Sequence, residues 1–409
     1  MLGSTICIGV LCAAVALALS AAGSSNGTVG SLSPIGSSGG GPGTTATSLP
    51  LAAIPTPGGA APNLAAFDAV SCPTTSMCVA VGGDGTGKGT SGVSFDGGHT
   101  WRLLTLPSST PELDAVSCTT VEECVAVGED TVVATTDGGE TWTSPAVPIT
   151  KTNLLGVTCT PGGLCIATGF APLPTEATSG RIVVSSDDGA TWTAAAIPSS
   201  SPGLASVACV SATQCIAVGA TILETDDGGT TWMPRTVEGG TLALRTIACS
   251  SPSHCIAVGP NPGGASRPSD PAVAVVTTDG GETWQRDAFP AGSAAVWQVA
   301  CASATTCISA GPNATGSTQA TYLTSADGGS TWSTAAAPAG LQAVAGVSCP
   351  GATDCVAVGQ LASGPAAAVT TDGMSWTSTP QPGATAAPTP ASTTVPVSTS
   401  STAVTTSSP

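Results

Sequence analysis

The chain has 409 residues, of which 52 are Gly and 33 are Pro, and only 8% of its residues are charged. Its formal net charge is −17 with eight Lys and Arg residues in total, which excludes nucleic acid and anionic membrane surfaces as partners, because both are bound through clusters of Lys and Arg. Aromatic residues make up 3% of the chain, so we expect its core to be built mainly from Val, Ile, Leu and Ala.

The N-terminal part of the chain is predicted to lie outside the folded domain. Residues 6–22 are apolar and end in small residues, which suits signal-peptidase cleavage after Ala22. We therefore expect residues 1–22 to be a signal peptide. The alternative is a short membrane anchor, although the apolar run is short for a membrane span. Residues 23–62 contain no charged residue and are rich in Gly, Ser and Pro, so we expect a flexible linker there.

Residues 63–380 repeat one pattern seven times. Each copy has two cysteines separated by five residues, a short strand of Val, Ala and Gly, and an acidic turn that ends in Trp. The cysteine pairs start 40 to 52 residues apart, which is the period of a four-stranded propeller blade. We therefore predict an all-β protein: a seven-bladed β-propeller of four-stranded antiparallel blades.

The second copy shows the expected strands clearly. Leu113–Cys118 and Cys124–Gly128 predict the first two strands, residues 132–136 the third, and residues 141–147 the fourth, which stops before Pro148. No segment of the repeats has a sustained helical period.

The repeated cysteines are predicted to form one structural disulfide in each blade. Each pair lies across the first hairpin, where facing Cα atoms are about 4.5–5.5 Å apart and within reach of a disulfide. Zinc would need converging pairs or histidine partners, and the chain has only His99 and His254. Seven disulfides indicate an oxidising compartment, so we expect a secreted or cell-envelope protein. The predicted disulfides are Cys72–Cys78, Cys118–Cys124, Cys159–Cys165, Cys209–Cys215, Cys249–Cys255, Cys301–Cys307 and Cys349–Cys355.

The acidic turn follows the pattern Ser/Thr-x-Asp-x-Gly-x-Thr-Trp, as in residues 94–101 (SFDGGHTW). An Asp carboxylate accepts N–H bonds within its own turn, Gly allows a positive φ, and a Trp ring fits between neighbouring sheets. We therefore expect a structural role for each turn rather than a shared metal or sugar site. The residues concerned are Asp96, Trp101, Asp137, Trp142, Asp187, Trp192, Asp227, Trp232, Asp279, Trp284, Asp327, Trp332, Asp372 and Trp376.

This turn resembles the Asp-box, or BNR-type repeat, of sialidases, sortilin-like receptors and several glycoside hydrolases. The strand before it is similar to the photosystem II assembly-factor propellers, as in residues 124–128 (CVAVG) leading to residues 135–142 (TTDGGETW). The resemblance covers about residues 64–380. It implies a propeller fold and suggests a scaffold or assembly role.

The last copy and the segment after it depart from the pattern. Residues 371–376 (TDGMSW) lack one Gly and have Ser in place of Thr. We expect this copy to lie at the seam of the ring, because terminal repeats are often atypical. Residues 381–409 are rich in Pro, Thr and Ser and are expected to form a disordered tail suited to O-linked sugars.

The candidate binding residues are expected on one face of the propeller. In an up-and-down blade, the cysteine loops and the acidic turns lie on one face of the propeller. The loops between the second and third strands, and the links between blades, lie on the opposite face. The second set varies, with insertions at residues 82–92, 170–180 and 260–271, and variable loops on a rigid scaffold often bind ligands. The candidates on this variable-loop face are Lys88, Glu129, Asp130, Glu176, Arg181, Asn261, Arg267, Asp270 and Asn313, with Lys151 and Arg245 from or near the links.

The function we expect is binding of a protein or glycan partner at the cell envelope by a monomer, without catalysis, metal or cofactor. The alternative is a glycoside hydrolase of the sialidase superfamily. That resemblance implies three arginines around a Tyr–Glu pair, but Arg102, Arg235 and Arg286 follow the Trp of their turns, toward the outer strand. Convergence of three arginines on Tyr322 would favour the hydrolase.

Overall fold

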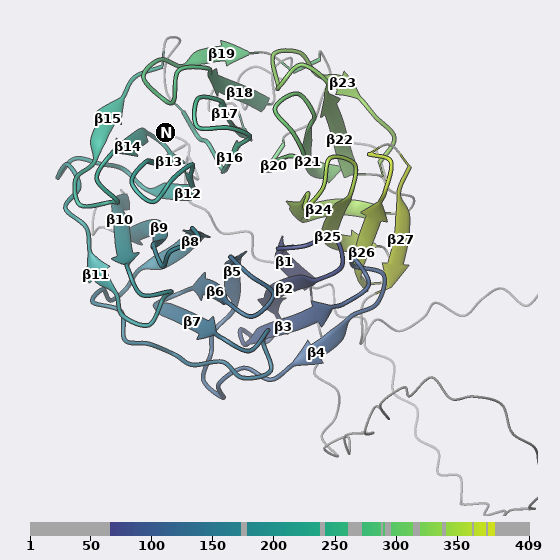
Figure 1. Cartoon of the computed structure of the whole chain (residues 1–409), viewed down its shortest axis with the longest axis horizontal. Coiled ribbons are helices and arrows are strands. Elements are labelled where there is room, and N and C mark those ends of the chain that lie inside the picture. The colour runs from purple at the N-terminus through teal and green to yellow at the C-terminus, as the bar shows by residue number, and fades with distance from the viewer. Residues whose placement is uncertain are drawn as a thin grey trace, which may run out of the picture. The chain divides into compact units, whose positions relative to one another are not determined.

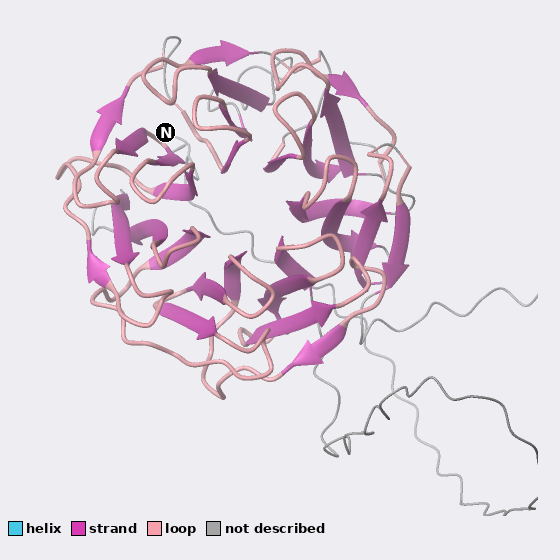
Figure 2. Cartoon of the chain, viewed as in Figure 1, coloured by secondary structure: helices cyan, strands magenta, loops and turns pink. Residues whose placement is uncertain are grey.

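All the regular structure in the described part of the chain is β-strand. The computed structural model describes residues 66–380 except 173–177, 238–241, 261–271, 288, 291–295, 314–319, 338–340, 362–363 and 374. These residues contain strands and loops and no helix, which confirms the all-β class (Figure 2). Accordingly, no described segment is a helix long and apolar enough to cross a membrane. The predicted signal peptide, linker and tail lie outside the described residues.

The strands follow one another in a recurring order that begins with a cysteine hairpin. The first strands end at or beside the first cysteine of each pair: β1 (Ala66–Ser71), β5 (Leu113–Cys118), β8 (Asn153–Cys159), β12 (Leu204–Cys209), β16 (Thr246–Cys249), β20 (Gln298–Cys301) and β24 (Leu341–Ser348). The second strands begin at the second cysteine: β2 (Cys78–Gly83), β6 (Cys124–Gly128), β9 (Cys165–Pro172), β13 (Cys215–Gly219), β17 (Cys255–Pro260), β21 (Cys307–Asn313) and β25 (Cys355–Leu361).

Two further strands complete most copies. The third strands lead into the acidic turns: β3 (Gly89–Ser94), β7 (Thr131–Thr135), β10 (Thr178–Ser185), β14 (Ile222–Thr225), β18 (Ala272–Thr277), β22 (Ala320–Ser325) and β26 (Gly364–Thr370). The fourth strands are short and follow the Trp: β4 (Arg102–Leu104), β11 (Thr193–Ala194), β15 (Met233–Arg235), β19 (Gln285–Asp287), β23 (Ser333–Thr334) and β27 (Thr377–Pro380). Strands β6 and β7 are buried throughout, which explains their nearly continuous Val and Ala.

The sheets are antiparallel and follow the predicted up-and-down order, with two departures. Strands β1–β4, β8–β11, β12–β15 and β16–β19 form four-stranded sheets. The last eight strands, β20–β27, are joined into one sheet, but only through the pairing of Pro312 with Ala343. Strands β5–β7 form a sheet of three. None of the sheets in the described ranges closes on itself.

The fourth strand predicted at residues 141–147 is wrong. Only Thr143 in this segment is paired, in an isolated bridge with Ala134 of β7. The next residue donates its side-chain hydroxyl, at 3.3 Å, to the Val132 carbonyl oxygen. Pro145 then has no N–H with which to extend the ladder. The sheet therefore ends in a bridge where other copies have a short strand.

The first strands of successive copies pack against one another in chain order. Each contacts the first strand of the next copy, from β1 to β24, and β24 contacts β1 (Figure 1). Apolar side chains fill the space between neighbouring sheets. Between the first and last copies, Phe67 and Trp101 share a buried cluster with Val356 and Val358. The last sheet therefore packs on the first as the intermediate sheets pack on their neighbours.

All seven predicted cysteine pairs are joined as disulfides. Their sulfur–sulfur distances are between 2.01 and 2.15 Å, and their Cα–Cα distances are 4.0 or 4.1 Å. The two cysteines face each other across the hairpin, as the pairing of Cys118 with Cys124 illustrates. Each disulfide therefore fixes the register of a first and second strand.

Candidate binding face

The carboxylates of the acidic turns are used within their own turns. Asp227 accepts the Thr231 N–H at 2.9 Å and the Thr231 hydroxyl at 2.6 Å, and the Thr225 hydroxyl at 2.8 Å. These bonds, led by that of the Thr231 hydroxyl, lower the pKa of Asp227 to about 2. The same pattern recurs at Asp96, Asp137, Asp187, Asp279 and Asp327.

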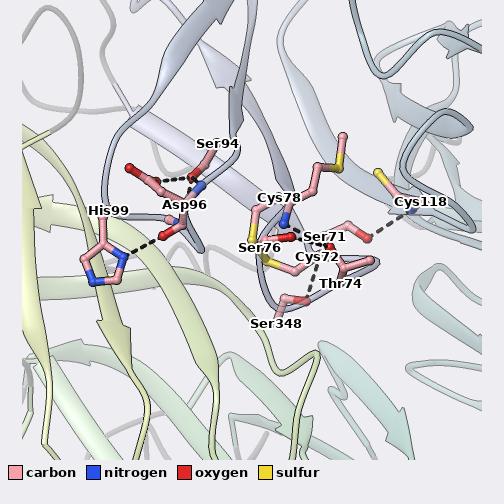
Figure 3. Close-up of a disulfide and its surroundings, with 12 residues drawn as sticks. Ser71, Cys72, Thr74, Ser76, Cys78, Ser94, Asp96, His99, Cys118 and Ser348 are labelled. Carbon is pink, nitrogen blue, oxygen red and sulfur yellow. Dashed lines mark hydrogen bonds between the residues drawn. A yellow bond between two sulfur atoms is a disulfide. The ribbon is translucent and has the colours of Figure 1, made fainter. Parts of the chain in front are cut away.

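The acidic turns also bind the cysteine loops, which confirms that the two lie on one face. In the turn that opens at Ser94, the Gly97 N–H donates to the Ser76 carbonyl oxygen at 2.8 Å. Figure 3 shows this region, with Ser94 beside Asp96 and with His99 Nδ1 donating to the Asp96 carbonyl oxygen at 2.7 Å. The polar groups of this turn thus bond to one another and to the turn's own backbone.

Hydrogen bonds on the same face also connect neighbouring copies. The Cys118 N–H donates to Ser71 Oγ at 3.0 Å, and the Cys72 N–H donates to Ser348 Oγ at 3.1 Å (Figure 3). The second of these bonds joins the first copy to the last. The serine in each bond directly precedes the first cysteine of its own copy.

On the opposite face, Lys88 and Arg181 each line a cavity. Lys88 is exposed beside a cavity of about 330 Å³, and Asp84 Oδ1 accepts the backbone N–H of Lys88 at 3.2 Å. Arg181 is half-buried beside a cavity of about 380 Å³. Its Nη1 donates to Ser179 Oγ at 2.6 Å and to the Gly180 carbonyl oxygen at 2.9 Å.

The described part of the insertion predicted at residues 170–180 is strand rather than loop. Strands β9 and β10 extend into it, with Phe170 paired with Gly180 and Pro172 paired with Thr178. The insertion therefore lengthens the sheet of the third copy. In the first copy, β2 and β3 likewise take up most of residues 82–92.

Glu129 and Asp130 form the turn between β6 and β7. Asp130 has a φ of 48°, a conformation that Asp tolerates better than most residues. Its carboxylate accepts the Thr152 N–H at 2.7 Å, and its own N–H donates to the Thr152 carbonyl oxygen at 2.8 Å. Both residues are exposed, and both contact the start of the third copy, Asp130 through Thr152 and Glu129 through a backbone bridge to Asn153.

The remaining predicted candidates are not brought into one site by the described structure. Glu176, Asn261, Arg267 and Asp270 lie outside the described residues. Asn313 is placed only by its backbone, which pairs with Ala320. Lys151 is an exposed link residue. Among the described residues, no group of three or more His, Cys, Asp and Glu is placed to hold a metal ion.

A second set of residues on this face was missed from the sequence. It occupies one position in every copy, four residues before the first cysteine of the pair, and we call it the inner-edge position. Its side chains are half-buried or exposed, whereas the residue before it is buried in every copy. At five of the seven positions the strand pairing skips this residue. The inner-edge residues are Asp68, Asp114, Leu155, Ala205, Arg245, Trp297 and Ala345.

Neighbouring inner-edge residues interact in two groups. The Arg245 guanidinium lies over the Trp297 ring, 5.1 Å from its centroid, in a cation–π contact. On β1 and β5, burial raises the pKa of Asp68 to about 7, and the negative charge of Glu112 adds to this effect. The same two causes raise the pKa of Asp114 to about 7, although its side chain is more exposed than that of Asp68. One side of the inner edge is thus acidic, and the other carries an Arg–Trp pair.

Counting back from the cysteines would have found these residues. Trp297 is the one tryptophan outside the acidic turns. The sequence places Arg245 only near a link, because it predicts variation in the loops and not at the inner-edge position.

Comparison with known families identifies the repeat. Residues 275–286, which include the turn of the fifth copy, match the family model of the BNR/Asp-box repeat. The turn of the fifth copy is an Asp-box, and the turns of the first four copies and of the sixth follow the same residue pattern. No curated protein matches the chain in sequence.

Solved structures with the same arrangement as this chain are β-propellers. YCF48 bound to a D1 peptide has a TM-score of 0.53 at 19% identity, over 73% of this chain and 92% of that one. Virginiamycin B lyase from Staphylococcus aureus has a TM-score of 0.55 at 12% identity, over 72% and 92%. The GH74 xyloglucanase from Xanthomonas campestris has a TM-score of 0.57 at 14% identity, over 78% and 55%. At these identities the likeness shows the fold alone.

The residues considered for an Asp-box hydrolase are dispersed. Tyr322 is 3% exposed and packs edge-on against Trp376, with ring centroids 5.3 Å apart. Burial raises the pKa of its hydroxyl, the opposite of what a nucleophile requires. The arginines Arg102, Arg235 and Arg286 each lie on the fourth strand of a different sheet. These three described arginines therefore do not converge on Tyr322.

Proposed function

We propose that this chain is an exported, seven-bladed β-propeller that binds a protein partner, without catalysis, through the inner-edge position of its variable-loop face. We count each disulfide hairpin as the start of one blade, so that the eight-stranded sheet consists of two blades joined at a single residue pair. Seven disulfides support an oxidising compartment, which is either extracellular or part of the cell envelope.

The variation at the inner-edge position carries this proposal. Cysteines, Asp-box residues and buried aliphatic residues recur from copy to copy because the fold requires them. The inner-edge position instead holds Asp, Leu, Ala, Arg and Trp in different copies, with no common structural requirement. Arg and Trp are the residues that most often dominate protein interfaces, and Arg245 and Trp297 lie side by side.

The charged residues at the inner-edge position indicate which side chains the partner presents to it. Asp68, Asp114 and Glu112 form an acidic side that favours Lys or Arg on the partner. The Arg245–Trp297 pair favours an apolar or acidic side chain next to that basic segment. The similar propeller YCF48, solved with a D1 peptide, supports a protein as the partner class. A glycan stacked on Trp297 is the competing occupant.

The test is recovery of a partner by the purified, disulfide-intact chain from an envelope fraction of its host. We expect Trp297→Ala to reduce recovery of the partner at least about tenfold, the cost of losing an interface hot spot. Phe95→Ala is the matched control, because Phe95 is 62% exposed on the Asp-box face. Equal loss in both variants, or equal recovery with both, contradicts the proposed face. Recovery that survives protease treatment of the fraction identifies a glycan instead of a protein.

A further inference from the structure

A cavity in the third copy lies on the outer part of the blade, away from the inner edge. It is bounded by β10, by β11 and the segment after it, and by Ile149 from the preceding link. Its volume of about 380 Å³ falls in the range of small-molecule sites, about 300–1,000 Å³. Most of its lining is apolar: Ile149, Ile182, Ala194, Ala195, Ala196, Ile197 and Pro198.

Arg181 is the one charged residue that lines this cavity in the described part of the chain. The chain has a net charge of −17 and only eight Lys and Arg, so a cation with no acidic neighbour in the lining is an exception. No ion pair of Arg181 is formed within the described residues. Among the described residues, no carboxylate neutralises the guanidinium that an anion entering here would meet.

The guanidinium is oriented by two acceptors on one nitrogen. Nη1 of Arg181 donates to Ser179 Oγ at 2.6 Å and to the Gly180 carbonyl oxygen at 2.9 Å. No hydrogen bond to a described residue uses Nη2 or Nε. A planar guanidinium with free donors on one side suits a carboxylate, which accepts two parallel N–H bonds.

Comparison among the copies shows that the fold does not require this arginine. The equivalent position lies four residues before the Ser or Thr that opens each Asp-box motif. The residues there are Thr90, Thr131, Arg181, Thr221, Val273, Thr321 and Ala366. Uncharged residues therefore satisfy the fold in six copies. The first copy also has a cavity at this place, but Asp84 lines it together with Lys88.

We propose that the cavity beside Arg181 binds a small aliphatic carboxylate. Arg181 holds the carboxylate through its free donors, and Ile149, Ile197, the alanines and Pro198 cover the hydrocarbon body. This site is separate from the protein-binding inner edge, so either proposal can fail without the other.

Titration calorimetry of the disulfide-intact chain with octanoate, below its micelle concentration, tests the site. We expect one octanoate to bind saturably to each chain. 1-Octanol, which lacks the charge, and acetate, which lacks the hydrocarbon chain, should both bind more weakly. Arg181→Gln should weaken octanoate binding about tenfold to a hundredfold, because a charge-assisted hydrogen-bonded pair is lost. Arg181→Lys keeps the charge but not the planar guanidinium. Its affinity for octanoate should therefore lie between those of the wild type and of Arg181→Gln.

The matched control is Arg102→Gln, which removes an exposed arginine paired with Glu140 on another sheet. It should leave octanoate binding unchanged. Circular dichroism confirms that each variant is folded before titration. The proposal is overturned if octanoate does not bind the wild-type chain, if Arg181→Gln binds it as tightly as the wild type, or if both Gln variants weaken it equally.

Discussion

Asp68 and Asp114 occupy equivalent bulges on neighbouring first strands, where their charges oppose folding. The pKa of Asp68 is raised from 3.8 to about 7 in the folded chain, so the folded state holds more protons than the unfolded state between these pH values. The contribution of Asp68 to the free energy of unfolding is therefore greatest below about pH 4 and is lost as the pH rises through about 7. A carboxylate that costs stability at neutral pH is consistent with retention for binding rather than folding.

Asp68→Asn is expected to stabilise the chain at pH 8 and not at pH 4. At pH 8 the substitution removes a charge that burial and Glu112 disfavour, for a gain on the order of 1 kcal/mol in the free energy of unfolding. At pH 4 the carboxyl is already neutral, so the gain disappears. Denaturant unfolding at both pH values measures this difference. Asp226→Asn, at an exposed turn position, is the control, and a pH-independent gain from Asp68→Asn contradicts the argument.

The Asp-box is an element in which one carboxylate joins both ends of a turn. Asp279 accepts the Thr283 N–H at 2.9 Å and the Thr277 hydroxyl at 2.7 Å, as well as the Thr283 hydroxyl. These bonds, led by the Thr283 hydroxyl, lower the pKa of Asp279 to about 2. Since the folded pKa lies below the unfolded value, the stability that they add is present above about pH 4 and is lost as the pH falls through about 2.

Asp279→Asn is therefore expected to destabilise the chain at pH 7 but not near pH 2. An exposed turn is well solvated, so we expect a loss of about 1 kcal/mol at pH 7. Thermal unfolding from pH 7 to pH 2 should show the two chains converging as the wild-type carboxylate gains its proton. Glu282→Gln, in the same turn and equally exposed, should show no such pH dependence. If Glu282→Gln lowers stability as much, charge on the turn rather than hydrogen bonding to Asp279 is responsible.

Strands whose ends are marked by a repeated residue, such as a cysteine, could be predicted from the sequence. Features that depend on a single proline or on a bulge could not. Strands β5 and β6 have the predicted bounds because the cysteines fix their ends, and β7 lies one residue earlier than predicted. The fourth strand failed at Pro145, where one missing N–H ends the ladder. The inner-edge position was missed because a bulge breaks the alternation on which strand patterns depend.

At the scale of the whole molecule, the repeat period predicts the number of hairpins, whereas closure depends on contacts between the two ends of the folded part. The cluster that joins the first and last copies combines residues more than 250 positions apart in the chain, such as Phe67 and Val358. No local pattern specifies such a contact. It follows from stacking each sheet on the one before until the last meets the first.

Closure predicts that the interface between the first and last copies is as tightly packed as an internal one. Val358, in that interface, and Val258, between the fifth and sixth copies, occupy equivalent positions and are both fully buried. We therefore expect Val358→Ala and Val258→Ala to lower the free energy of unfolding by similar amounts, about 1–3 kcal/mol each. Denaturant unfolding of the two variants, with disulfides intact, measures this. A much smaller loss for Val358→Ala would mean that the first and last sheets separate in solution and that the ring is open.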